Sequence, residues 1–194
     1  IDVADLVGAV ILRADGNLTA CLRDRVISLD AETGKELESV SMPAAHGKSP
    51  IPLRMNDAKC SPEGVLYAGS MFIEECPEAK GASALYRIQD TSVHLVLPDV
   101  TLSNGLGWSP DGSAMYYIDT RTQRIDRFDY SPQTGPTNRR TFVEIPETDG
   151  NPDGLCTDQD GGVWVALWGT GKVVRFEDSG RLSQEVVMPT PQPT

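Results

Sequence analysis

The chain has few of the residues that build zinc centres, disulfide scaffolds or histidine-dependent catalytic sites. Its 194 residues include four cysteines and two histidines. The cysteines form no C-x-x-C pair and are too sparse for a disulfide scaffold, so we expect mostly buried thiols, with Cys76 in a polar insertion as the candidate for exposure. His46 and His94 lie far apart and form no pair at metal-ligand spacing. Zinc chemistry and Ser-His or Cys-His catalysis are therefore poorly supported.

Long apolar runs and basic runs are also missing. No apolar stretch approaches the roughly 20 residues of a membrane-spanning helix, and residues 1–5 lack the basic start of a secretory signal. We therefore predict a cytoplasmic protein with no membrane partner. The formal net charge of -11, without a stretch dense in Lys or Arg, argues against a nucleic-acid partner. Such a net charge indicates either an ordinary acidic surface of a soluble protein or an electric field that attracts cations.

The chain does contain a repeat of about 48 residues, marked by an acidic residue followed by glycine. These glycines are 48, 48 and 49 residues apart: Gly16, Gly64, Gly112 and Gly161. Apolar runs on both sides of each pair predict a β-hairpin. Two further strand-like runs follow in each repeat, and no window of 12 or more residues has a helical period. Four short antiparallel strands per repeat predict an all-β fold, a β-propeller with one blade per repeat.

The repeats set the expected domain organisation. We predict a single β-propeller domain over residues 1–194, with repeats at approximately 5–50, 51–99, 100–147 and 148–194. A ring that does not close exposes blade faces to water, which is a liability for a soluble protein. Self-association through open blade edges is therefore one expectation.

Polar residues recur in step with the repeat. Asn56, Asn104 and Asp153 each stand eight residues before a repeat glycine, and Gly8 holds that place in the first repeat. If the repeats superimpose, the three side chains occupy one structural position and converge on the propeller axis. Converging amide and carboxylate oxygens are typical ligands of a hard cation. The alternative is that the Asn and Asp side chains only form turns before the glycines that follow them.

Three short motifs extend this pattern. They are Arg-Met-Asn-Asp at 54–57, Ser-Asn-Gly-Leu at 103–106 and Pro-Asp-Gly-Leu at 152–155. Their order and spacing resemble the family of gluconolactonase, regucalcin (senescence marker protein) and luciferin-regenerating enzyme. The resemblance covers essentially the whole chain. It implies a six-bladed β-propeller, of which this chain resembles the central four blades.

The resemblance also implies a metal-dependent hydrolysis of lactones, with a divalent cation on the axis. Asn104 and Asp153 match metal ligands of the family, Asn56 matches a substrate contact that can also approach the metal, and Asp153 matches the catalytic base. Arg54 and Glu75 match substrate-binding residues. The expected ion is Ca²⁺, with Zn²⁺, Mg²⁺ and Mn²⁺ as alternatives. The residues alone leave two other roles open, a salt bridge between blades for Arg54 and a surface loop for Glu75.

One departure from the family affects the functional prediction. The third metal ligand of the family is a Glu on the blade before the first one present here, and residues 1–9 contain no Glu. We predict a lactonase-type hydrolase whose small-molecule substrate is a sugar lactone or a related cyclic ester. The alternatives are a non-catalytic calcium-binding propeller module and an inactive fragment that lacks the Glu ligand.

Overall fold

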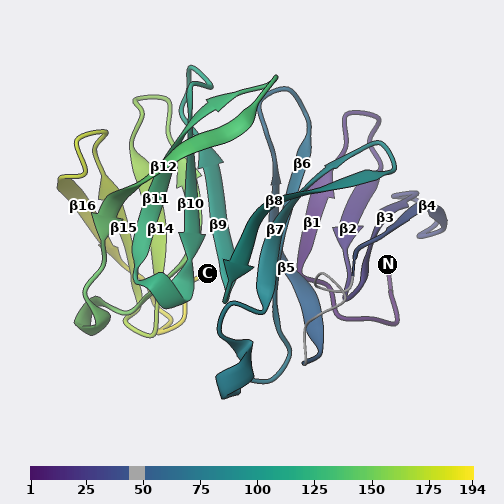
Figure 1. Ribbon diagram of the computed structural model, residues 1–194, viewed down its shortest axis with the longest axis horizontal. Helices are drawn as coiled ribbons and strands as arrows, with labels where there is room; N and C mark the ends of the chain where they lie inside the picture. Colours follow the sequence, from purple (N-terminus) through teal and green to yellow (C-terminus); the bar gives the residue numbers. More distant parts are fainter. Residues whose placement is uncertain (44–50) are drawn as a thin grey trace. The chain divides into compact units, whose positions relative to one another are not determined.

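The fold is all-β. The computed structural model describes residues 1–43 and 51–194, so His46 and the junction of the first two predicted repeats lie outside the described residues. The described part contains 16 strands in four antiparallel four-stranded sheets (Figure 1). It contains no α-helix, and hence none long and apolar enough to cross a membrane. The predicted all-β architecture of four-stranded blades is confirmed.

Each sheet is a meander in which neighbouring strands follow one another along the chain. The first sheet contains β1 (Ala9–Leu12), β2 (Leu18–Cys21), β3 (Arg25–Leu29) and β4 (Glu36–Ser41). The second contains β5 (Leu53–Cys60), β6 (Leu66–Phe72), β7 (Ser83–Gln89) and β8 (Ser92–Val100). The third contains β9 (Ser103–Trp108), β10 (Ala114–Asp119), β11 (Arg124–Ser131) and β12 (Gly135–Glu144). The fourth contains β13 (Asn151–Thr157), β14 (Val163–Trp168), β15 (Lys172–Phe176) and β16 (Leu182–Val187). Within residues 1–43 and 51–194, three single-turn 3-10 helices lie in the connections: η2 (Pro77–Ala79), η3 (Thr120–Thr122) and η4 (Glu147–Asp149).

The repeat glycines lie where the first two strands of each sheet turn. Their φ angles are 86°, 86°, 69° and 81° in chain order. A positive φ is costly for a residue with a Cβ and is readily adopted by glycine. The predicted acidic-Gly hairpin turns are therefore confirmed, and they account for the most regular feature of the sequence.

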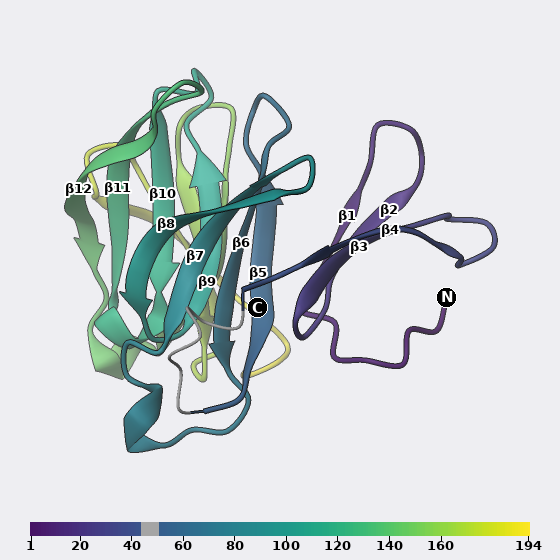
Figure 2. The same cartoon turned by 45° about the vertical axis from the view of Figure 1, so that its right-hand side comes forward.

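The chain forms two compact units, each with two sheets. Unit 1 comprises residues 1–60 and 64–103, and unit 2 comprises residues 61–63 and 104–194. Figure 2 labels the strands of the two sheets of unit 1, β1–β4 and β5–β8. In this unit a buried apolar cluster contains Cys21 of the first sheet and Tyr86 of the second. In unit 2 a corresponding cluster contains Ile125 of the third sheet and Val174 of the fourth. Burial of apolar side chains between the two sheets of a unit thus stabilises that pair of sheets. The exact boundaries of the four repeats stay a prediction.

The cysteines only partly match the expectation of buried thiols. All four are free; Cys21 is buried, and Cys60 and Cys76 are half-buried. Cys156 is exposed on β13, so the expectation is wrong for this residue. Its side chain follows the period-2 alternation of a strand, in which neighbouring residues point to opposite faces.

Candidate oxygen-ligand site

Asn104 and Asp153, two of the predicted site residues, come together in unit 2. Asn104 lies on β9 with 8% of its surface exposed, and Asp153 lies half-buried on β13. The Asn104 side chain lies close enough to the Asp153 carboxyl to lower its pKa. Both residues belong to strands, and neither has a positive φ. The alternative that they only form turns is therefore wrong.

Two backbone features bring these strands close together. The β13–β14 register shifts between Pro152 and Leu155, so Asp153 lies in a bulge, and such bulges re-aim side chains. On β9, a Cβ added to Gly105 would stand 2.7 Å from the Asp153 carbonyl oxygen and 2.6 Å from the Leu155 nitrogen. Only glycine allows this approach, because a Cβ at that distance would overlap the neighbouring backbone. The Asn-Gly pair of the Ser-Asn-Gly-Leu motif thus supplies a polar side chain and a close backbone contact.

A residue that the sequence did not mark, Thr120, links the two strands. The Asn104 Nδ2 donates to the Thr120 Oγ1 at 2.9 Å, and this hydroxyl donates to the Pro152 carbonyl oxygen at 2.8 Å. Thr120 is 5% exposed and opens η3 directly after β10. It carries no periodic or motif signal, since a threonine at a strand end is common in any β-protein.

The electrostatics of Asp153 distinguish it from the ion-paired carboxylates of the chain. Burial raises the pKa of the Asp153 carboxyl, and hydrogen bonds from Thr194 and Asn104 lower it in part. Both of these partner side chains are uncharged. Within residues 1–43 and 51–194, no Lys or Arg forms an ion pair with Asp153. A half-buried carboxylate without a basic partner is an environment that a bound cation would stabilise.

Arg54 and Asn56 lie two residues apart on β5 in unit 1. The Asn56 Nδ2 donates to the Ser103 carbonyl oxygen at 2.8 Å, and the Arg54 Nη1 donates to the Met55 carbonyl oxygen at 3.0 Å. The β5–β6 register shifts between Met55 and Ala58, so Asn56 lies in a bulge, as Asp153 does. Arg54 forms no ion pair with the described residues, which contradicts the alternative of a salt bridge between blades.

Glu75 lies in the loop between β6 and η2 of unit 1, and its side chain is exposed. Its position agrees with the alternative of a surface loop. The substrate-binding roles of Arg54, Asn56 and Glu75, and the metal-binding role of Asn56, stay predictions.

The donor chemistry excludes one kind of metal centre in the described part of the chain. No group of three or more His, Cys, Asp or Glu side chains there is arranged to hold a metal ion. The oxygen donors that do come together are one amide and one carboxylate, on Asn104 and Asp153. Oxygen donors of this kind suit Ca²⁺ or Mg²⁺, so the residues present fit part of a hard-cation site.

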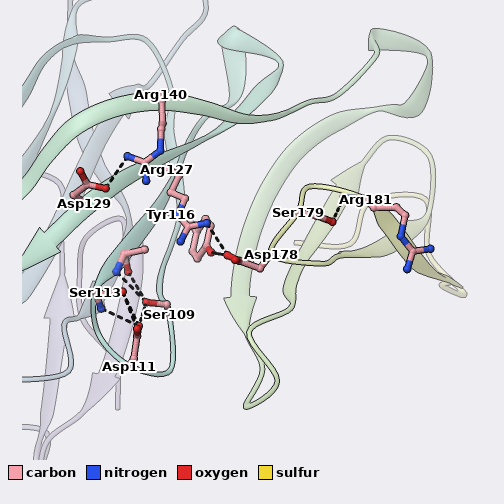
Figure 3. A network of polar contacts seen from close by, with 11 residues as sticks. Ser109, Asp111, Ser113, Tyr116, Arg127, Asp129, Arg140, Asp178, Ser179 and Arg181 are labelled. Carbon is pink, nitrogen blue, oxygen red and sulfur yellow. Dashed lines mark hydrogen bonds and ion pairs between the residues drawn. The ribbon is translucent and has the colours of Figure 1, made fainter.

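A second polar network in unit 2 serves a structural purpose. Figure 3 shows Tyr116 and Arg127 directed at Asp178, which follows β15. The Tyr116 hydroxyl donates to the Asp178 Oδ1 at 3.2 Å, and the Arg127 Nη1 lies 2.6 Å from the same oxygen. Burial raises the pKa of Tyr116 to about 12. The network fastens the third sheet to a turn of the fourth.

The Asp-Gly turn of the third repeat is also drawn in Figure 3. Asp111 accepts hydrogen bonds from the Ser109 hydroxyl at 2.6 Å and from the Ser113 backbone nitrogen at 3.0 Å. Hydrogen bonds from these two serines lower the pKa of the Asp111 carboxyl to about 2. This carboxylate closes its own turn, so it is not a candidate ligand.

Successive four-stranded antiparallel meanders, with a polar position on the first strand of three of them, define this chain as a β-propeller protein. Comparison with known proteins identifies its family. The family described as "SMP-30/Gluconolactonase/LRE-like region" matches residues 1–194. The chain therefore belongs to this family, as the three motifs predicted.

Individual relatives agree with this assignment. The chain is 37% identical over 146 residues to the L-arabinolactonase of Azospirillum brasilense, covering 74% of this chain and 48% of that protein. It is 35% identical over 193 residues to regucalcin of Sus scrofa, covering 97% of this chain and 63% of that protein. Among solved structures, a calcium-binding protein, regucalcin, from Agrobacterium tumefaciens matches with a TM-score of 0.87 and 26% identity, covering 99% of this chain and 63% of that one. The chain thus spans between about half and two thirds of the length of these relatives.

Proposed function

We propose that the protein to which this chain belongs is a metal-dependent hydrolase of sugar lactones or related cyclic esters. The observation that carries the proposal is the Asn104–Asp153 pair. The close approach of Gly105 to the Asp153 backbone brings the two residues together, and Asp153 is a carboxylate with a pKa raised by burial. The lactonase names within the family, such as the L-arabinolactonase, support the reaction class. Calcium binding by the Agrobacterium regucalcin supports a hard cation.

The two residues would supply the ligands and the base. Asn104 and Asp153 would hold a divalent cation through an amide and a carboxylate oxygen. When bound, such a cation polarises an ester carbonyl and lowers the pKa of a bound water. The Asp153 carboxyl also has a proton-accepting role, because a raised pKa makes a carboxylate a better base near neutral pH. The acidic balance of the chain, with a formal net charge of -11, favours the approach of cations.

Substitution of the pair tests the proposal. In the full-length protein, we expect Asn104→Ala and Asp153→Ala each to lower the turnover of gluconolactone and arabinolactone by about 100-fold or more, since each removes a ligand. Asn138→Gly is the control; it removes an exposed amide from β12 and keeps a positive φ. Lactone hydrolysis that is unchanged by both alanine variants would contradict the assignment.

A further substitution separates the two roles of Asp153. Asp153→Asn keeps an oxygen donor and removes the proton acceptor. If Asp153 is the base, the Asn variant retains measurable cation binding in a calorimetric titration and loses hydrolysis. If Asp153 is only a ligand, hydrolysis and cation affinity fall together.

The second candidate is a calcium-binding propeller without turnover. It is favoured by the description of the Agrobacterium regucalcin as a calcium-binding protein. Calcium titration beside a lactone assay separates the two functions. Tight binding with no hydrolysis of any sugar lactone tested would favour this second candidate.

A further inference from the structure

We propose that Thr120 is a positioning residue that sets the direction of the Asn104 side-chain amide. This inference rests on the proposed cation site, of which Asn104 is a ligand. Thr120 does not itself contact a substrate in the proposal. It acts through Asn104, by determining which end of the amide faces the neighbouring strand.

The argument starts from the single proton of the Thr120 hydroxyl. That proton is donated to the Pro152 carbonyl oxygen at 2.8 Å, because a carbonyl oxygen can only accept. The hydroxyl oxygen is then an acceptor toward Asn104, 2.9 Å away. An amide presents its nitrogen to an acceptor, so Thr120 selects the Nδ2 side of Asn104.

The neighbouring carboxylate makes the same selection. The Asn104 side chain lowers the pKa of the Asp153 carboxyl, as expected when the amide N–H side faces the ionised carboxyl. The Nδ2 group carries two protons and can serve both acceptors. With both contacts made, the Oδ1 is fixed on the other branch of the amide. A rotated amide would turn its oxygen toward Thr120 and the Asp153 carboxyl and lose the hydrogen bond to Thr120.

Burial makes the selection strong. Asn104 is 8% exposed and Thr120 is 5% exposed, so water competes poorly for these groups, and a hydrogen bond lost here leaves a costly buried polar atom. Pro152 precedes Asp153 directly, so its carbonyl ties Thr120 to the strand that carries the second proposed ligand. Thr120 therefore holds both ligands of the pair in one hydrogen-bonded chain.

Two substitutions of Thr120 in the full-length protein test this role. Thr120→Val keeps the shape of the side chain and removes the hydroxyl, whereas Thr120→Ser keeps the hydroxyl and removes the methyl group. In calorimetric titration with calcium chloride, and with manganese chloride as a second probe, we expect Thr120→Val to weaken binding by ~10-fold or more. We expect Thr120→Ser to stay within about twofold of the wild type, because it keeps the link.

A matched control comes from the same pair of strands. The Thr157 hydroxyl of β13 donates to the Trp108 carbonyl oxygen of β9 at 2.6 Å. Thr157→Val therefore removes the same kind of interstrand hydrogen bond without touching Asn104. If Thr120→Val and Thr157→Val weaken cation binding equally, the effect is general loosening of the strands, and the positioning role is overturned.

The metal-free protein gives an independent readout. In nuclear magnetic resonance spectra, the Asn104 side-chain amide signal is identified by its loss in Asn104→Asp. We expect its protons to be protected from exchange in the wild type and in Thr120→Ser, and to exchange at least tenfold faster in Thr120→Val. Equal protection in all three proteins overturns the inference. A wild type that binds no cation would instead contradict the proposed function on which it rests.

Discussion

Asn56 in unit 1 and Asn104 in unit 2 hold the same place in their repeats, yet they reach the next strand in different ways. The Asn56 amide nitrogen donates directly to the Ser103 carbonyl oxygen at 2.8 Å. The Asn104 nitrogen reaches the Pro152 carbonyl oxygen through the Thr120 hydroxyl. In each unit the carbonyl belongs to the residue directly before the next repeat position. The asparagine therefore reaches the equivalent carbonyl directly in unit 1 and through a hydroxyl in unit 2. In unit 2 the Asn104 side chain also lowers the pKa of the Asp153 carboxyl.

A second contrast concerns the glycines of the two units. In unit 2 the polar residue and the close-contact glycine are separate, Asn104 and then Gly105. In unit 1, Gly8 holds the repeat position itself, and a Cβ added there would stand 2.3 Å from the Met55 carbonyl oxygen and 2.6 Å from that of Asn56. A side chain at position 8 is therefore incompatible with the packing of unit 1. This explains physically why the first repeat has no polar residue in this register.

The largest expected effect is the substitution Gly8→Ala. A Cβ 2.3 Å from a backbone oxygen forces the strands apart, so we expect the free energy of unfolding to fall by about 3 kcal/mol. Gly16→Ala is the control. Its φ of 86° makes alanine strained, but no atom lies within 4 Å of the added Cβ, so we expect a loss of about 1 kcal/mol. Urea denaturation of the full-length protein measures both, and equal losses would show that close packing at Gly8 does not exclude a side chain there.

The next expected effect is a pH dependence of stability. It tests the buried Tyr116 hydroxyl, which contacts Asp178 and so joins the two sheets of unit 2. The folded pKa of Tyr116, about 12, lies above the usual value of 10. The folded state therefore holds this proton more tightly, and the resulting stabilisation is complete below pH 10 and is lost as the pH rises toward 12. By a pH of about 11.5, about 2 kcal/mol of this stabilisation is lost.

Tyr116→Phe isolates this contribution, because the variant cannot titrate at that position. We expect the stability difference between wild type and variant in urea denaturation to shrink as the pH is raised from about 9 to about 11.5. A difference that stays constant over this range would show that burial of the Tyr116 hydroxyl does not raise its pKa as described.

The smallest effect concerns the direct link of unit 1. Asn56→Ala removes one hydrogen bond to the Ser103 carbonyl oxygen, and we expect a loss of about 1 kcal/mol in the free energy of unfolding. Asn56→Asp keeps the shape but places a carboxylate oxygen against that carbonyl, so it should be the more destabilising of the two. If Asn56→Asp is instead tolerated better than Asn56→Ala, the direct donor link is wrong.

Much of this architecture could be predicted from the sequence because it has a local cause. The hairpin turns follow from Asp-Gly and Glu-Gly pairs, and the strands follow from short apolar runs at a fixed period. The pairing of Asn104 with Asp153 could also be predicted, because residues at equal repeat positions lie on the equivalent strands of neighbouring blades.

The remainder depends on tertiary contacts that leave no trace in the spacing. Thr120 lies 16 residues from Asn104, outside the repeat register, and only the folded strands bring their side chains to 2.9 Å. Similarly, nothing near Gly8 indicates that the Met55 carbonyl occupies the space of its missing side chain. The division into two units was not predicted either, since the repeat is nearly uniform along the whole chain.

The open surroundings of the first two hairpin turns have a practical consequence for assay design. Gly16 and Gly64 are exposed, and a Cβ added to either meets nothing within 4 Å. Exposed turn tips of this kind tolerate short insertions. A peptide tag or fluorophore placed there would let the protein be immobilised or followed optically during cation titration, without attaching anything to the strands that carry Asn104 and Asp153.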